Sequence, residues 1–403
     1  MKINKEFIHK IPKTDLHLHL DGSLRLSTLI ELAKENNVEL PAYTEKELKE
    51  KVFKDKYNHL GEYLQGFAYT CAVLQRETAL ERVAYELALD NIAEGVMYIE
   101  VRFAPQLHQH KHLGTINVLK SVNRGLARAQ EEFNRTKAVK SGEGVPFYYG
   151  IIVCAMRMFD YGFSEYFDSL LDVHNHSERT WIFSLASQEL VKASVEARDI
   201  HDVPIVGFDL AGMEKGYPAS DHKPAYDLAH KNFMNKTVHA GEAYGAESIF
   251  QAITDLNADR IGHGVHLFNA DMVNDPGIKD KAAYVDSIAQ YLGDRRITLE
   301  ICLTSNMQTI PAFKSLEQHS FGRMRQNGLS VTLCTDNRLV SNTTISKEIM
   351  LALDAFDITD TKELKNLVAY GFKRSFFPGT YVEKRSYVRR VLDTYEAIEK
   401  KFK

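Results

Sequence analysis

Short hydrophobic runs alternate with longer helix-like patterns along this chain of 403 residues. Eight of the runs are almost continuously apolar and rich in β-branched and aromatic residues, which is typical of parallel strands buried on both faces. In the intervals between them, apolar residues recur three and four positions apart, the spacing of an amphipathic helix. The predicted strands are 14–20, 96–103, 147–154, 204–210, 236–240, 259–264, 297–302 and 330–336.

Eight strand and helix units in alternation predict an α/β protein of the (β/α)8 TIM barrel type, forming one domain over residues 1–403. Extra helices are expected in the first crossover and at the C-terminus. In the first crossover, Leu60, Leu64 and Phe67 form a helical stripe with Tyr63 beside it; we expect this stripe to pack in the core, the alternative being a roof over the site. The charged run at 135–144 is expected to be a solvated loop. The clearest predicted helices are 26–35, 79–94, 118–133, 248–256 and 387–402.

Composition narrows the class of protein. A chain that is 44% hydrophobic and 26% charged has ample material for a globular core. A net charge of −4 gives no basic field for nucleic acid or an anionic membrane, so a small neutral ligand fits better. We expect no membrane span and no signal peptide, because charges interrupt every apolar group near the N-terminus. The scattered cysteines predict reduced thiols in a cytoplasmic protein: Cys71, Cys154, Cys302 and Cys334.

Polar residues gather at the carboxyl ends of the predicted strands, where barrel active sites are built. In DLHLHLDG, His17 and His19 are two positions apart and therefore point to the same face of a strand. The polar residues and the glycine at the strand ends are His17, His19, Asp21, Asp209, Gly212, His239, Glu242, His263, Ser305, Asn306, Asp336 and Asn337.

Three imidazoles and one carboxylate among them, with no thiolate, suit zinc or a similar divalent ion. The four expected ligands are His17, His19, His239 and Asp336. Such an ion lowers the pKa of a bound water from about 15.7 toward about 7. Glu242 is then expected to carry a proton beside the metal, and His263 to orient the water or help deprotonate it.

Each of these residues also has a purely structural explanation. His17, His19 and His263 could be buried histidines bonded to the backbone, Glu242 a charge favoured at a helix N-terminus, and Asp336 a helix cap. Their joint placement at one end of the barrel favours the site.

Six motifs, in this order and spacing, resemble the adenosine deaminase family of amidohydrolase-type metal-dependent barrels: DLHLHLDGS, DLAGME, TVHAGE, RIGHG, LEICLTSN and LCTDN. The resemblance extends from about Lys13 to the C-terminal helices. The unrelated zinc deaminases that act on cytosine carry His-x-Glu and Pro-Cys-x-x-Cys, and neither pattern is present here.

The resemblance implies that one zinc ion is held by the four ligands named above and that water adds to C6 of a purine while ammonia leaves. The position of Glu242 protonates N1, so its carboxyl needs a raised pKa. His263 and Asp336 polarise the water. Gly212 donates its N–H to N3, and Asp21 binds the ribose 5′-hydroxyl.

Asn337 departs from the pattern, since many members carry a second aspartate there that contacts purine N7. An Asn amide is a ready N–H donor to N7, so the contact should survive, although the finer substrate preference is then open. Ser305 and Asn306 are candidates to support Asp336, or else they only cap the loop.

The sequence therefore predicts zinc-dependent deamination of adenosine and 2′-deoxyadenosine to inosine and 2′-deoxyinosine, in purine salvage and nucleotide metabolism, by a monomer or weak homo-oligomer. Deamination of adenine, AMP or a modified nucleoside is the alternative. An anionic Asp21 disfavours the phosphate of AMP, although Arg25 could offset that repulsion. A purine-binding barrel without catalysis has no use for Glu242 and His263.

Overall fold

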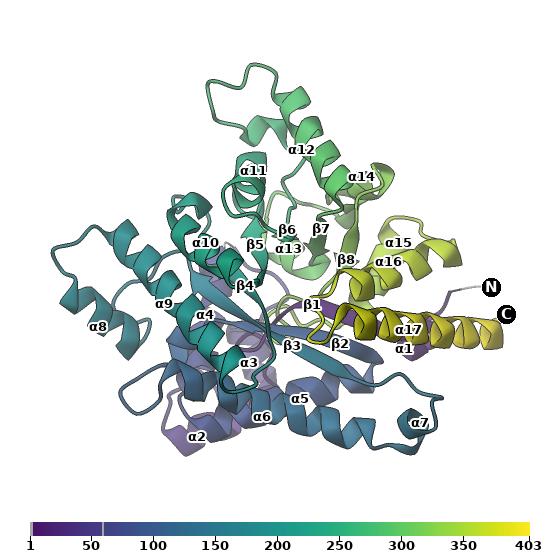
Figure 1. Cartoon of the computed structure of the whole chain (residues 1–403), viewed down its shortest axis with the longest axis horizontal. Coiled ribbons are helices and arrows are strands. Elements are labelled where there is room, and N and C mark those ends of the chain that lie inside the picture. The colour runs from purple at the N-terminus through teal and green to yellow at the C-terminus, as the bar shows by residue number, and fades with distance from the viewer. Residues whose placement is uncertain (1–2, 59) are drawn as a thin grey trace.

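The computed structural model describes residues 3–58 and 60–403. Its eight strands are parallel and hydrogen-bonded in chain order. Beyond the last strand, Asp336 donates to the His17 carbonyl and accepts from the His19 amide at 2.8 Å each, which brings the two edges together. The predicted (β/α)8 barrel is confirmed (Figure 1). The strands are β1 (Lys13–His19), β2 (Val96–Phe103), β3 (Tyr148–Met156), β4 (Ile205–Ala211), β5 (Asn235–Ala240), β6 (Arg260–His263), β7 (Thr298–Ile301) and β8 (Val331–Leu333).

Helices surround the strands (Figure 1). The longer helices bury one apolar face, as α6 does with Val118, Val122 and Leu126. The strands are buried on both faces, and every residue of β2 is buried. The five clearest predicted helices are all present, and the last of them begins earlier than predicted. The α-helices are α1 (Lys5–Lys10), α2 (Leu26–Asn36), α3 (Glu45–Lys51), α4 (Leu60–Val73), α5 (Glu77–Ala93), α6 (Thr115–Asn134), α7 (Lys137–Lys140), α8 (Glu165–Val173), α9 (Arg179–Asp199), α10 (Lys223–Lys231), α11 (Ala246–Thr254), α12 (Lys281–Arg295), α13 (Leu303–Thr309), α14 (Phe321–Gln326), α15 (Ile345–Ala355), α16 (Thr361–Arg374) and α17 (Tyr381–Phe402). Four short 3₁₀ helices are η1 (Pro105–His108), η2 (Ala219–His222), η3 (Ala270–Met272) and η4 (Leu316–Gln318).

Two local expectations were wrong. The run at 135–144 contains the short helix α7 and is not all loop. In α4 the buried stripe is not the aliphatic one, because Leu64 is 38% exposed and Phe67 only partly buried; the side chain of Leu60 lies outside the described residues. Tyr63 is buried instead, since its hydroxyl finds polar partners at the carboxyl end of the barrel. The alternative, in which this insertion covers the site, agrees with that orientation.

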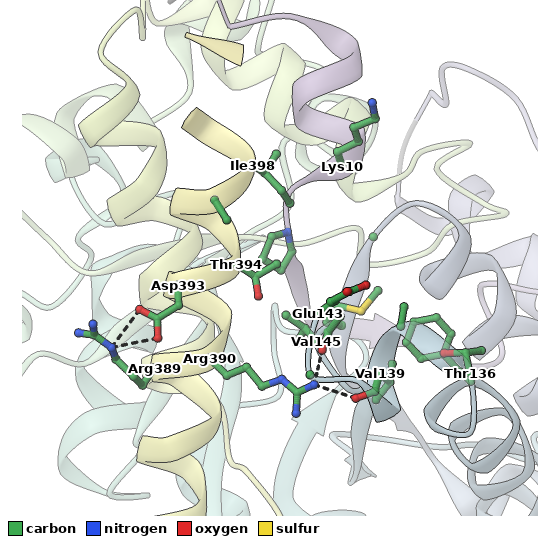
Figure 2. A pocket seen from close by; sticks show the side chains of 18 of the residues that line it. Lys10, Thr136, Val139, Glu143, Val145, Arg389, Arg390, Asp393, Thr394 and Ile398 are labelled. Carbon is green, nitrogen blue, oxygen red and sulfur yellow. Dashed lines mark hydrogen bonds and ion pairs between the residues drawn. The ribbon is translucent and has the colours of Figure 1, made fainter. Parts of the chain in front are cut away.

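Other elements lie at the amino-terminal end of the barrel, opposite the predicted site. Helices α1 and α17 pack together there through Phe7, whose ring centroid lies 5.8 Å from that of Tyr395. A groove runs beside α17, where Arg390 donates to the carbonyls of Val139 and Gly144 (Figure 2). This groove lies at the strand ends opposite those that carry the predicted site. No described helix has the length and hydrophobicity needed to cross a lipid bilayer.

Candidate active site

Four side chains with metal-binding groups meet at the carboxyl end of the barrel. His17 and His19 belong to β1, His239 to β5, and Asp336 follows β8. The Nε2 atoms of His19 and His239 lie 3.2 Å apart, and Asp336 Oδ1 lies 3.5 Å from Nε2 of both His17 and His19. One donor atom of each residue lies within 4.8 Å of the other three. The structure thus brings together the four ligands that the sequence predicted.

Carboxylates behind two of the histidines determine which ring nitrogen faces the centre. Glu300 Oε2 lies 2.9 Å from His17 Nδ1, and Asp209 Oδ2 lies 3.0 Å from His239 Nδ1. A proton on each Nδ1 leaves the Nε2 lone pair available, the usual arrangement of metal-binding histidines. His17 Nε2 is buried and has no hydrogen-bond partner among the described residues. Because such an unpaired atom costs free energy, the four residues fit a divalent cation.

The protonation states also suit a cation. Burial, together with the charge of Arg102, lowers the pKa of His17 to about 4, and burial lowers the pKa of His19 as well. Burial alone would raise the pKa of Asp336, but its contacts with the histidines, His17 first, hold that pKa well below its ordinary value. At neutral pH His17 and His19 are therefore neutral and Asp336 is ionised, which are the forms that bind metals.

A network of buried charges supports these ligands from inside the barrel. Arg102 lies 2.8 Å from both Asp209 and Glu300, and Arg260 lies 2.7 Å from Glu300. Burial lowers the pKa of His239, but the Asp209 carboxylate outweighs it, so that the pKa of His239 is raised. Removing one partner of such a buried set leaves an uncompensated charge, and the network therefore fixes Asp209 and Glu300 behind the histidines.

Glu242 and His263 lie beside the four ligands. Glu242 Oε2 is 3.7 Å from His263 Nε2, and the two side chains are 17% and 1% exposed. Burial raises the pKa of Glu242, and Asp336 adds to the shift while His263 opposes it. The result favours a neutral carboxyl that can give up a proton. His263 and Asp336 adopt φ values of +65° and +62°, a backbone conformation that costs free energy in residues with side chains and is concentrated at functional sites.

The loop that carries Glu242 is held by another carboxylate. Glu214, in the loop after β4, accepts four backbone N–H bonds from residues 241–244, at 2.7, 3.1, 2.6 and 3.0 Å. Glu214 itself is buried. Bonds to a charged acceptor are stronger than neutral ones, so Glu214 fixes the backbone of the loop that bears Glu242.

A chain of hydrogen bonds reaches the other side of His263. Its Nδ1 lies 3.0 Å from Asn306 Nδ2, and Asn306 Oδ1 lies 3.1 Å from His319 Nε2. The backbone N–H of Phe321 donates to His319 Nδ1 at 3.0 Å. Asn306 therefore supports His263, whereas Ser305 supports Asp336 by donating to its Oδ2 at 2.6 Å.

The residues expected to bind the substrate lie around the same centre. Gly212 has φ +96°, which requires glycine, and it is exposed at the end of β4. Asp21 is buried beside His19, and one of its oxygens has no partner among the described residues. Burial raises the pKa of Asp21 to about 7. Arg25, which the sequence offers as a phosphate partner, instead forms an ion pair with Asp90 at 2.6 Å.

Asn337 contacts the inserted helix α4. Its Nδ2 donates to the Tyr63 hydroxyl at 2.7 Å, and that hydroxyl also lies 3.0 Å from Ser341 Oγ. The Asn337 amide has a second N–H, because a primary amide carries two. The insertion therefore orients the residue that differs from the family pattern.

Several supporting residues were missed from the sequence. Glu300 is the one charge in β7, and Arg102 is one of two in the otherwise apolar β2, beside Glu100; charges in such strands were the signal that could have found them. Glu214, the last residue of the DLAGME motif, and His319 lie in irregular segments whose partners are set by the loop conformation, so the sequence did not indicate what they contact. The sequence singles out Tyr63 but does not link it to Asn337.

Comparison with known proteins agrees with this geometry. The sequence matches the family profile described as adenosine deaminase over residues 12–199 and 178–393. Adenosine deaminase 1 of Streptomyces coelicolor is 35% identical over 374 residues, which cover 92% of this chain and 84% of that protein. A probable adenosine deaminase of Dictyostelium discoideum is also 35% identical, and there the match covers 93% of this chain but 42% of the relative. The solved apo structure of the N6-methyl-AMP deaminase of Arabidopsis thaliana has a TM-score of 0.72 at 25% identity, covering 97% of this chain and 98% of that one.

Proposed function

This chain belongs to the adenosine deaminase family of hydrolases, and we propose that it converts adenosine and 2′-deoxyadenosine to inosine and 2′-deoxyinosine with release of ammonia. The observation that carries the proposal is the meeting of three imidazoles and one carboxylate beside the Glu242 and His263 pair. A site for binding alone has no need of a proton donor and a group that contacts a nucleophile.

His17, His19, His239 and Asp336 would hold one Zn²⁺ per chain. That ion would supply a water molecule acidified toward neutral pH and a positive charge close to C6 of the purine. His263 contacts the attacking oxygen, and Asp336 polarises it.

Glu242 gives its proton to purine N1. Protonation at N1 localises the C6=N1 bond as an electrophile, so attack at C6 becomes easier. Burial supports this role because it raises the pKa of Glu242, which favours the protonated form. Glu214 maintains the position of Glu242 through the loop backbone.

Three residues would bind the nucleoside. The N–H of Gly212 donates to N3, and the free N–H of Asn337 donates to N7. Asp21 binds the ribose 5′-hydroxyl, for which its unpaired buried oxygen is suited. In neither protonation state does Asp21 offer the positive charge that a 5′-phosphate needs, and the guanidinium of Arg25 is paired with Asp90. These features favour a nucleoside over AMP or N6-methyl-AMP.

We further propose that residues 1–403 act as one catalytic domain, in a monomer or weak homo-oligomer, in cytoplasmic purine salvage. The four cysteines are free thiols, as the reducing cytoplasm would keep them.

The test is a substrate panel. Purified enzyme is mixed separately with adenosine, 2′-deoxyadenosine, AMP, adenine, N6-methyladenosine and N6-methyl-AMP, and ammonia or methylamine release is measured with a chelator and after zinc is restored. Chelator-sensitive conversion of the two unmodified nucleosides alone supports the proposal. Faster conversion of a nucleotide, adenine or a methylated substrate would move the substrate assignment, and no conversion of any compound would favour a non-catalytic purine-binding barrel.

A further inference from the structure

Asn306 lies between two buried histidines that belong to different parts of the site. All three side chains are almost completely shielded from water, with exposures of 0% for Asn306, 1% for His263 and 2% for His319. Asn306 and His319 both belong to the segment that connects β7 to β8. One crossover thus supplies a chain of hydrogen bonds that ends on His263.

The direction of this chain is fixed at its far end by a group that can only donate. The backbone N–H of Phe321 donates to His319 Nδ1, so that nitrogen is the acceptor of the ring. Burial lowers the pKa of His319 to about 3, and the ring is therefore neutral, with its single proton on Nε2.

The donor and the acceptor of each following bond are set by the bond before it. His319 Nε2–H donates to Asn306 Oδ1 at 3.1 Å, which makes the oxygen of the amide the acceptor. The Asn306 NH₂ group is then the one that faces His263 Nδ1 at 3.0 Å, and an NH₂ group can only donate. His263 Nδ1 must accept.

We propose that Asn306 is a positioning residue that holds neutral His263 in the tautomer with its proton on Nε2, the nitrogen facing Glu242. This inference rests on the proposed function, because it assigns the part that His263 plays there. His263 then donates a hydrogen bond to the attacking oxygen and does not accept a proton from it at Nε2. This tautomer decides between the two roles that the sequence left open for His263, orienting the water or deprotonating it, in favour of orienting it.

The same bonds would exist if Asn306 merely satisfied buried polar groups. The test therefore has to reverse the direction of the hydrogen bond to His263 without changing the shape of the side chain at position 306. Asn306→Asp does this, because a carboxylate only accepts. It would accept from His319 Nε2–H and from His263 Nδ1–H, which moves the His263 proton to Nδ1. We expect kcat to fall by roughly 10²- to 10⁴-fold, the usual cost of a misplaced proton at a catalytic histidine, with a much smaller change in KM.

Two variants serve as controls. His319→Gln presents an amide N–H to Asn306 Oδ1 and keeps the direction of the chain, so kcat should fall far less than in Asn306→Asp. Asn327→Asp adds the same charge at an exposed position at the end of α14 and should leave kcat unchanged. If Asn306→Asp leaves kcat unaltered, or if His319→Gln lowers it equally, the proposal is wrong.

A direct reading of the tautomer in the wild-type enzyme needs no activity measurement on a variant. The zinc-loaded wild-type enzyme is labelled with ¹⁵N-histidine, and the ring signals of His263 are assigned by their loss in His263→Gln. We expect a protonated Nε2 and an unprotonated Nδ1 in the resting enzyme, while a proton on Nδ1 would overturn the inference. Because this reading needs no substrate, its failure is distinguishable from absence of deaminase activity, which would overturn the proposed function instead.

Discussion

Removing the Glu214 carboxylate measures how far catalysis depends on the loop that carries Glu242. A hydrogen bond to a charged acceptor contributes about 1.5 to 3 kcal/mol net, and Glu214 accepts four of them. The contributions of the four bonds are not additive, because three of the donors belong to half-buried residues and can form hydrogen bonds with water instead. Only Gly241 is buried, and its unpaired N–H costs about 1 to 3 kcal/mol. We therefore expect Glu214→Ala to loosen the loop by about 1 to 3 kcal/mol, the cost at Gly241.

That energy converts to a reduction in rate if it keeps Glu242 in position. At 1.36 kcal/mol for each factor of ten, kcat/KM for adenosine should fall roughly 5- to 160-fold. Glu214→Gln should lie between Glu214→Ala and the wild type, because an amide keeps one acceptor oxygen. Lys215→Ala, at the exposed neighbouring position, is the matched control and should leave kcat/KM unchanged.

The loop itself can be followed by hydrogen exchange. In Glu214→Ala the amides of residues 241–244 should exchange much faster, while the barrel strands keep their protection, because the loop opens locally. Wild-type activity with unchanged exchange at these four amides would refute the reasoning. Loss of protection throughout the barrel would instead assign Glu214 a role in global stability.

Three further results are expected. Glu242→Gln should retain zinc and nucleoside binding but lose roughly 10²- to 10⁴-fold in kcat, since an amide cannot protonate N1; near-normal turnover would exclude the proton-donor role. A chelator should stop turnover and lower the Tm, because His17 Nε2 has no hydrogen-bond partner among the described residues once the ion is removed, and zinc should reverse both effects; full activity in metal-free protein would contradict this. Burial raises the pKa of Asp15 to about 7, so the folded protein binds a proton that the unfolded chain releases, and stability should fall by up to about 4 kcal/mol as pH rises from about 4 to above 7. Urea unfolding should find this slope weaker in Asp15→Asn, and equal slopes in the two proteins would argue against it.

The barrel could be predicted because its strands are buried on both faces and therefore read as continuous apolar runs. The residues at the strand ends could be predicted for a related reason. In a parallel barrel all carboxyl ends meet at one face, so His17 and His239 had to lie near each other although 222 positions separate them along the chain. Chain order and strand polarity were sufficient for that step.

The supporting groups could not be predicted in the same way. Glu214 depends on the path of one loop across another, and no periodic pattern specifies that path. In α4 the apolar stripe indicated the wrong face, because hydrogen bonds of Tyr63 with Asn337 and Ser341 decide the rotation of the helix. Polar partners from distant segments override local hydrophobic pattern at such positions.

The two halves of the site are held by different means. The four residues proposed to hold the metal lie on or beside strands and are supported by buried ionic groups, as His17 is by Glu300. Glu242 and His263, which are proposed to protonate N1 and to contact the attacking oxygen, are held by crossover segments, through Glu214 on one side and Asn306 on the other. Because the two supports share no residue, substitutions at Glu214 or Asn306 should lower turnover in a protein that still binds its zinc. Substitution of Glu300 should weaken zinc binding and catalysis together, so metal content measured beside kcat separates the two classes.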